Sequence, residues 1–376
     1  MMRRLALLFL VLTLANLLAA DAESKAKKGQ GHVQIALLLD TSNSMDGLID
    51  QAKTRLWQVV NEIATARKRG LPPQLEVALY EYGKSSIPAD AGYIRQILPF
   101  TSDLDAISEQ LFALTTNGGD EYCGLVINQA LDQLEWRPGS GDFKAVFIAG
   151  NEPFDQGPAN FRTVCGKAIA AGVVVNTIFC GSQNEGINTH WKEGADLADG
   201  RFMVIDQQQV ISHVQAPQDG RILALGQALN DTFIPIGAEG RKAKQRQEEQ
   251  DLMAASVAEE VAVARTVTKA SPVYAKEPWD LSSALSDKKV DIATIDDADL
   301  PEPMRGMDTA EKQAYVQKME RKRTDLQQQI TQLQEERKAW LEKQQREKAT
   351  GTLDQAMIAV VREQMQKKQF QFPKKR

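Results

Sequence analysis

The sequence is poor in the side chains that most often mark a catalytic or zinc centre. Its 376 residues include only three histidines (His32, His190 and His213) and three cysteines. The cysteine spacing matches no zinc ligand set, and we expect the histidines to be surface or packing residues. The chain has no Gly-x-Ser-x-Gly elbow, no Walker loop and no Gly-x-Gly-x-x-Gly loop. The sequence therefore predicts a protein that is not an enzyme.

A strong charge of one sign is also missing. The chain has 45 Lys and Arg against 50 Asp and Glu, a formal net charge of -5. A general nucleic-acid binder would need a concentrated basic face, so we expect no nucleic-acid partner. Residues 367–376 are an exception, because they hold five Lys or Arg and no acid. They form a basic tail to which the sequence assigns no use.

Long apolar runs are absent beyond the first residues. Residues 1–4 include two arginines, residues 5–18 are apolar but short for a membrane span, and Ala20-Asp21-Ala22 fits a small-x-small cleavage rule. This pattern predicts a secretory signal peptide over residues 1–22, with an uncleaved anchor as the alternative. We expect a periplasmic or secreted protein with no membrane span in the mature chain.

The three cysteines, Cys123, Cys165 and Cys180, are an odd number. An exported chain folds in an oxidising compartment, where two of them can form a disulfide. Buried, reduced cysteines that behave as small apolar residues are the alternative. The sequence leaves both interpretations open and does not fix a pairing.

Strand-like and helix-like segments alternate from residue 33 to about residue 215, after a polar linker at 23–31. Apolar and β-branched runs predict strands over residues 33–39, 75–82, 93–99, 143–149, 173–179 and 201–205. Apolar residues at helical spacing predict helices over residues 46–69, 103–114, 122–134, 159–171, 191–199 and 207–214. Such alternation is typical of an α/β fold with a doubly wound, mostly parallel, Rossmann-like sheet covered on both faces. We place this domain at residues 32–236.

The remainder of the chain is predicted to be mainly helical. Residues 237–308 read as a helical, loop-rich connector, in which we expect three apolar anchors: Tyr274, Trp279 and Leu281. Residues 309–376 read as a partly coiled-coil region, because apolar residues of the helix at 309–348 repeat every 3.5 residues. Arg323 and Arg337 occupy two positions of that apolar seam. The second helix, near residues 353–365, can fold back to make a hairpin, or the long helix can pack on its own chain. Oligomerisation through the seam is the alternative.

One loop carries a pattern suited to a metal ion. Asp40-Thr41-Ser42-Asn43-Ser44 follows a strand that is expected to be buried and precedes a helix. Sites in parallel sheets form at the carboxyl ends of the strands, where this loop is expected. Alternate residues of the turn can direct Asp40, Ser42 and Ser44 to one point, and oxygen ligands suit Mg²⁺ or another hard divalent cation.

The loop and its surroundings resemble the von Willebrand factor A (vWA) domain family. The resemblance rests on the strand at 35–39, the Asp-x-Ser-x-Ser loop that follows it, the Gly118-Gly119 loop and the segment Ile148-Ala149-Gly150-Asn151-Glu152-Pro153, within residues 32–215. It implies a vWA fold, and it implies that Asp40, Ser42 and Ser44 are the leading part of a metal-ion-dependent adhesion site. The chain is accordingly identified as an exported, bacterial-type vWA protein with a helical C-terminal region.

Two positions depart from the family pattern, so the expected site is degenerate. Where the family has a Thr after paired Gly, this chain has Asp120, and where the family has a strand-ending Asp, it has Gly150. We expect Asp120 to contribute a carboxylate oxygen and Asn151 an amide oxygen. The alternative is that Asp40, Ser42 and Ser44 only cap the following helix and satisfy backbone N–H groups.

The resemblance implies a binding protein. A divalent cation at this loop would be completed by an acidic group on a protein partner, with the C-terminal helices as a spacer or second docking surface. The alternative is a metal-free structural or assembly factor of the cell envelope that acts through its helical tail.

Overall fold

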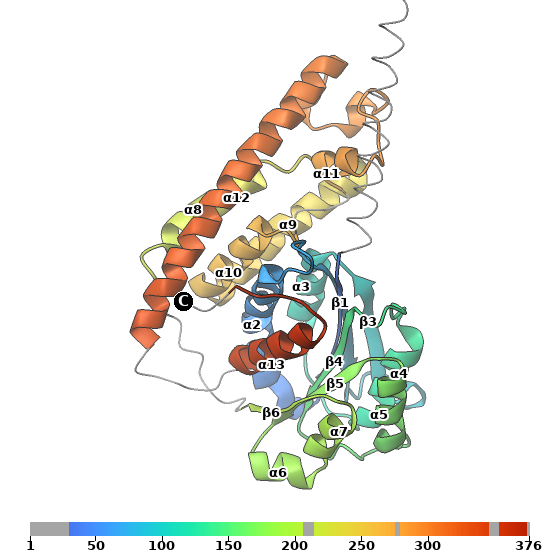
Figure 1. Cartoon of the computed structure of the whole chain (residues 1–376). Coiled ribbons are helices and arrows are strands. Elements are labelled where there is room, and N and C mark those ends of the chain that lie inside the picture. Colours follow the sequence, from blue (N-terminus) through green and yellow to red (C-terminus); the bar gives the residue numbers. More distant parts are fainter. Residues whose placement is uncertain (1–29, 206–213, 275–278, 346–352, 374–376) are drawn as a thin grey trace, which may run out of the picture.

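The computed structural model describes residues 30–205, 214–274, 279–345 and 353–373 (Figure 1). The predicted signal peptide and, except for its last residue, the helix expected at 207–214 lie outside these residues. Six strands form one sheet in the order β3-β2-β1-β4-β5-β6. The strands are β1 (His32–Asp40), β2 (Gln74–Tyr82), β3 (Ile94–Thr101), β4 (Phe143–Gly150), β5 (Val174–Cys180) and β6 (Phe202–Ile205). All neighbours pair in parallel except β2 and β3, which confirms the doubly wound, mostly parallel α/β class.

Helices cover both faces of this sheet (Figure 1). The helices of the α/β part are α2 (Asp46–Thr65), α3 (Leu104–Ala113), α4 (Cys123–Gln133), α5 (Phe161–Ala170), α6 (Gln183–Asn188) and α7 (Trp191–Leu197). Successive side chains of β1 point to opposite faces: Ile35 packs in the cluster with α2 and α3, whereas Ala36 and Leu38 pack in the cluster with α4 and α5. Burial on both faces explains why β1 is an almost unbroken apolar run.

The other described helices meet the α/β part through α10 and α13, which pack on α2, and through α9, which packs on α3 (Figure 1). They are α8 (Asp219–Asn230), α9 (Gly237–Val257), α10 (Glu259–Ala270), α11 (Leu281–Ser286), α12 (Thr309–Gln345) and α13 (Leu353–Lys367), with short 3₁₀ turns at Asn43–Met45, Ala89–Ala91, Asp297–Asp299 and Glu302–Met304. The anchors Tyr274 and Leu281 are buried, and Trp279 stacks near Phe233 with ring centroids 5.6 Å apart. The described helices include no segment with the length and hydropathy of a membrane span.

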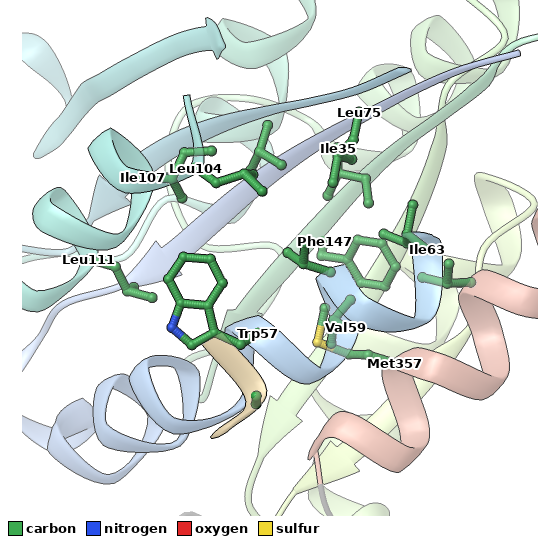
Figure 2. Close-up of a cluster of buried hydrophobic side chains, with 14 of the residues drawn as sticks. Ile35, Trp57, Val59, Ile63, Leu75, Leu104, Ile107, Leu111, Phe147 and Met357 are labelled. Carbon is green, nitrogen blue, oxygen red and sulfur yellow. The ribbon is translucent and has the colours of Figure 1, made fainter. Parts of the chain in front are cut away.

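The hairpin expected for residues 309–376 is wrong, because α13 packs on α2 and β6 of the α/β part instead of lying along α12 (Figure 1). Its Val361 is fully buried, and Met357 reaches the cluster around Val59 and Ile63 of α2 (Figure 2). A buried amide pair, Gln364 Nε2 to Asn176 Oδ1 at 2.7 Å, joins α13 to β5. The last described helix therefore completes the α/β fold, and α8 to α12 are inserted between β6 and α13.

The long helix α12 packs on α8, α10 and α11 of its own chain. The two arginines on its apolar seam are buried in ion pairs: Arg323 with Asp280, and Arg337 with Asp219. A tight coiled-coil seam has no such partners, so these pairs explain why the 3.5-residue repeat contains arginine. One apolar cluster runs from the sheet through α2 and α10 to α8 and α12, so both parts share a continuous core.

Candidate metal site

Asp40, the last residue of β1, lies at the centre of the candidate site. Its side chain is completely buried, and Oδ1 accepts a hydrogen bond from the backbone N–H of Ser42 at 2.8 Å. The second oxygen, Oδ2, is buried without a hydrogen-bond partner. A buried carboxylate oxygen with no donor is costly, so this atom marks a place where a cation or a proton would be bound favourably.

Two hydroxyls of the same loop lie next to this carboxylate. Ser42 Oγ is 3.3 Å from Ser44 Oγ, and the Asn151 amide nitrogen donates to Ser44 Oγ at 3.1 Å. Neither hydroxyl caps a helix: Ser42 makes no side-chain cap to the 3₁₀ turn, and α2 has no side-chain cap at its N-terminus. The structure thus brings Asp40, Ser42, Ser44 and Asn151 together, with Ser44 on the exposed side.

The residue that joins them from the Gly118-Gly119 loop is Glu121 rather than Asp120. Asp120 is exposed, and its Oδ2 accepts a hydrogen bond from the Tyr122 hydroxyl at 3.1 Å. Glu121 is buried, and a Cβ added to Gly83 would lie 2.7 Å from Glu121 Cγ and 2.9 Å from Asp40 Oδ1. The two carboxyl side chains therefore converge on the same small space. Glu121 therefore lies at the position where Asp120 was expected.

Sequence reasoning missed Glu121 because a loop has no fixed side-chain period. In a strand or a helix the spacing decides which residue faces the site, but in an irregular loop the choice between adjacent positions depends on backbone angles. The only sequence signal at position 121 indicated the wrong environment, because an acidic residue before an apolar helix is ordinarily exposed. Glu152 was missed for the same reason. Its backbone carbonyl accepts from the Trp191 indole N–H at 2.7 Å, which ties this loop to α7.

The carboxyl groups repel one another in a poorly solvated place. Burial raises the pKa of Asp40 to about 7, and the Glu152 charge adds to the rise while hydrogen bonds from Ser42 oppose it. Burial also raises the pKa of Glu121 to about 7, with further contributions from the charges of Asp40 and Glu152. Three acids without a nearby base make a site of negative potential that favours a cation.

Gly150 leaves no room for the aspartate that the vWA pattern has at the end of this strand. A Cβ there would lie 2.5 Å from the Tyr82 hydroxyl and 3.0 Å from Asp40 Oδ2. Tyr82 is completely buried and donates its hydroxyl proton to the Ala149 carbonyl at 2.9 Å. The tyrosine therefore fills the space in which a longer side chain at position 150 would project.

These residues fit a small divalent cation in the chemistry of their donors. Asp40 Oδ2 is unpartnered, and the neighbouring side chains from three loops carry hydroxyl, carboxylate and amide oxygens, which are the ligand types of Mg²⁺. Across the described ranges no three His, Cys, Asp or Glu side chains form a metal-binding group by themselves. Any cation here must therefore use Ser42 and Ser44, as the Asp-x-Ser-x-Ser spacing implies.

The cysteines and histidines form no second centre in the described part of the chain. Cys123, Cys165 and Cys180 are free and buried, so the interpretation of the cysteines as small apolar residues holds. Burial raises the pKa of all three thiols, that of Cys165 to about 11, which keeps them protonated and unreactive. His190 pairs with Glu193 at 2.8 Å, and His32 is the first residue of β1. His213 lies outside the described residues.

Comparisons with known proteins place the chain among low-identity structural neighbours. Neither a protein-family profile nor a curated protein matches the sequence. The VWA domain of SpRpn10 is 14% identical with a TM-score of 0.35, and the match covers 48% of this chain and 98% of that one. BatB from Bacteroides thetaiotaomicron is 17% identical with a TM-score of 0.35, covering 46% of this chain and 90% of that one.

A third similar structure is proximal thread matrix protein 1 from the mussel byssus, with a zinc-occupied MIDAS motif. It is 17% identical with a TM-score of 0.33, covering 48% of this chain and 43% of that one. At this level of likeness nothing about the ligands of the present chain follows from its neighbours. The strand order and the Asp40 loop at the carboxyl edge of the sheet give this chain a doubly wound α/β domain, with a helical region inserted before α13.

Proposed function

We propose that the chain is an exported binding protein that engages an acidic group of a protein partner through a divalent cation. The observation that carries the proposal is Asp40 Oδ2, a buried carboxylate oxygen with no donor, beside two loop hydroxyls. The cation would supply a positive, coordinatively open point to which a partner's carboxylate binds. Nothing in the site resembles a nucleophile with its base, so binding rather than catalysis is favoured.

The residues have distinct roles in this proposal. Ser42 and Ser44 would ligate the cation directly, since their hydroxyls are adjacent and Ser44 is exposed. Asp40 would accept a hydrogen bond from cation-bound water and supply charge. Glu121 would supply the second charge, and Asn151 an amide oxygen at the rim. Hydroxyl ligands leave the cation short of negative charge, so an acidic group from outside completes its coordination favourably.

The test is a calorimetric titration of Mg²⁺ and of Mn²⁺ into the chelator-treated chain. We expect binding heats in the wild type, none in Asp40→Ala, and at least about tenfold weaker binding in Glu121→Gln, since removing one charged contributor typically costs that much. Asp120→Asn is the matched control, because it removes the adjacent carboxylate and should leave the affinity unchanged. Absent heats in both the wild type and Asp40→Ala would end the proposal.

A metal-free assembly factor of the cell envelope is the second candidate. It is favoured by Gly150, because the aspartate of the vWA pattern is missing and Tyr82 fills its place. Partner capture would then persist in chelator and in Asp40→Ala, but fail when the exposed α12 residues Glu335, Glu336 and Lys338 are replaced. Deletion of residues 309–376 is unsuitable for this test, because α13 belongs to the α/β core.

A further inference from the structure

Basic side chains gather at the end of the sheet opposite to Asp40. Here the parallel strands begin, at His32 in β1 and Phe143 in β4, about 26 Å along β1 from Asp40 at roughly 3.3 Å per residue. Five cations make up this group, which we call the basic end: Lys68, Arg69, Arg137, Lys144 and Lys368. They come from the chain after α2, the loop before β4, β4 itself and the chain after α13.

The loop at 137–141 brings three of the cations together. Lys68 Nζ donates to the Gly141 carbonyl, and Lys368 Nζ to the Ser140 carbonyl at 3.1 Å. Lys144 Nζ donates to the Arg137 carbonyl at 3.0 Å and to the carbonyl of Ala171, at the C-terminus of α5, at 2.6 Å. These bonds use one donor of each lysine or two, so each ammonium keeps at least one free N–H.

The cations of the basic end repel one another. Burial lowers the pKa of Lys68, and the charges of Arg69 and Lys368 lower it further, while Asp142 raises it. Burial and the charge of Lys368 also lower the pKa of Lys144. The loops hold these like charges at close range, an arrangement that an external anion would relieve.

The acids near this end are too few to balance it. Asp142 lies 3.6 Å from Arg137 Nε and accepts the His32 backbone N–H at 3.3 Å. Glu76 accepts from the Gln34 amide at 2.9 Å. Exposed Glu135 adds a third carboxylate at this end, because its backbone carbonyl accepts from the same Gln34 amide at 3.2 Å. Against these three carboxylates stand five cations, of which Arg69 and Arg137 are exposed. The local charge is therefore positive although the whole chain carries -5.

Both ends of the described chain meet at this place. A Cβ on Gly31 would lie 2.5 Å from the Phe370 ring and 2.6 Å from Lys68 Cδ, and Arg67 pairs with Gln371 through backbone hydrogen bonds. The sequence that continues from each end is also basic. It adds Lys25, Lys27 and Lys28 on one side and Lys374, Lys375 and Arg376 on the other.

We propose that the basic end is a docking surface for anionic lipid headgroups, so that the protein sits on a membrane surface with the Asp40 edge directed away from it. The predicted export segment at 5–18 favours lipid over other anions. Seven residues separate Ala22 from Gln30, and the eight steps between them span at most about 28 Å, so this end faces the bilayer while that segment is inserted. Basic clusters beside a membrane bind anionic lipids electrostatically, with about fivefold in affinity for each Lys or Arg.

The test is co-sedimentation with vesicles of phosphatidylcholine alone or with 30% phosphatidylglycerol, roughly the anionic fraction at which such clusters bind. The protein is the chain from Glu23 onward, which keeps every described residue and omits the apolar segment. The test variant combines Arg69→Asn, Arg137→Gln and Lys368→Gln. Asn suits position 69, where φ is 53°. The matched control removes three exposed α12 cations in Lys318→Gln, Arg321→Gln and Lys322→Gln.

We expect the wild type and the control to bind anionic vesicles at low ionic strength and to be released by salt. The test variant should bind about 100-fold more weakly, and none should bind phosphatidylcholine alone. Three results overturn the proposal: no binding by the wild type, equal loss in test and control variants, or binding of a homopolymeric RNA in place of vesicles. Circular dichroism of each variant checks that its fold is intact. The outcome is independent of cation binding at Asp40.

Discussion

Replacing Arg323 by methionine tests whether the apolar seam of α12 packs on helices of its own chain or forms a coiled coil with a second copy. In the structure, Arg323 donates to both oxygens of Asp280, at 2.8 and 3.0 Å, and its Nε donates to Thr232 Oγ1 at 3.1 Å. Its guanidinium also stacks over the Phe233 ring, 4.2 Å from the centroid. Arg323 is nearly buried, and Asp280 is completely buried.

The expected cost follows from what methionine would leave behind. Removing one partner of a buried ion pair typically costs about 3–5 kcal/mol, because the other charge stays buried. Asp280 keeps hydrogen bonds from the backbone N–H groups of Ile234 and Ser283, which hold part of its charge. We therefore expect Arg323→Met to lower the free energy of unfolding by about 3 kcal/mol, the lower end of that range.

Urea denaturation at pH 7 measures this change, and Arg321→Met, an exposed arginine two residues away, is the control. A coiled-coil seam predicts the opposite sign, since an apolar residue there would stabilise an oligomer. Light scattering during gel filtration reports the oligomeric state. A variant as stable as the wild type, or a more stable one that dimerises, would refute the packing of α12 on its own chain.

Three further predictions test the site and the core. Asp40→Asn removes a carboxyl whose pKa of about 7 lies above the ordinary 3.8, so the folded state holds this proton more tightly than the unfolded chain. In EDTA, the free energy of unfolding of the wild type should therefore fall by up to about 4 kcal/mol as the pH rises from about 4 to about 7. Denaturation at several pH values should show a smaller fall for the variant. Val361→Ala in α13 should cost about 2 kcal/mol in urea denaturation, and an effect near zero would contradict the assignment of α13 to the core. Gly150→Ala should lower the melting temperature, because the added Cβ would contact the Tyr82 hydroxyl. Combining this change with Tyr82→Phe should restore part of the lost melting temperature, and no restoration would argue against that contact.

The sheet was predictable because its strands carry a strong local signal. β1 and β4 are buried on both faces, so they appear as continuous apolar runs, and helices with apolar residues at helical spacing separate them. The end of α2 was placed too late, at residue 69 rather than Thr65. Arg67 instead forms a backbone bridge with the distant Gln371, which is not visible in a local pattern, and Lys68 bridges to Leu71 in a tight turn.

The C-terminal arrangement was not predictable from local pattern. The apolar residues of α13 are those of any amphipathic helix, and nothing in its sequence says whether the apolar side faces α12 or the distant helix α2. Likewise, the local sequence indicates only that Arg323 and Arg337 would weaken a coiled coil. It does not show their ion-pair partners Asp280 and Asp219, which are 43 and 118 residues away. The Asp40 loop was placed correctly because it follows directly from the end of β1.

The insertion of α8 to α12 before α13 has a consequence for biosynthesis. The face of the sheet that α13 covers is assembled from segments beginning at residue 32, but the covering helix is among the last to be made. During synthesis, apolar side chains of α2 and β6 stay uncovered until residues 353–367 are made. The nascent chain should therefore depend on a holding chaperone until α13 has emerged, and translation products that end before residue 353 should aggregate rather than accumulate as folded fragments.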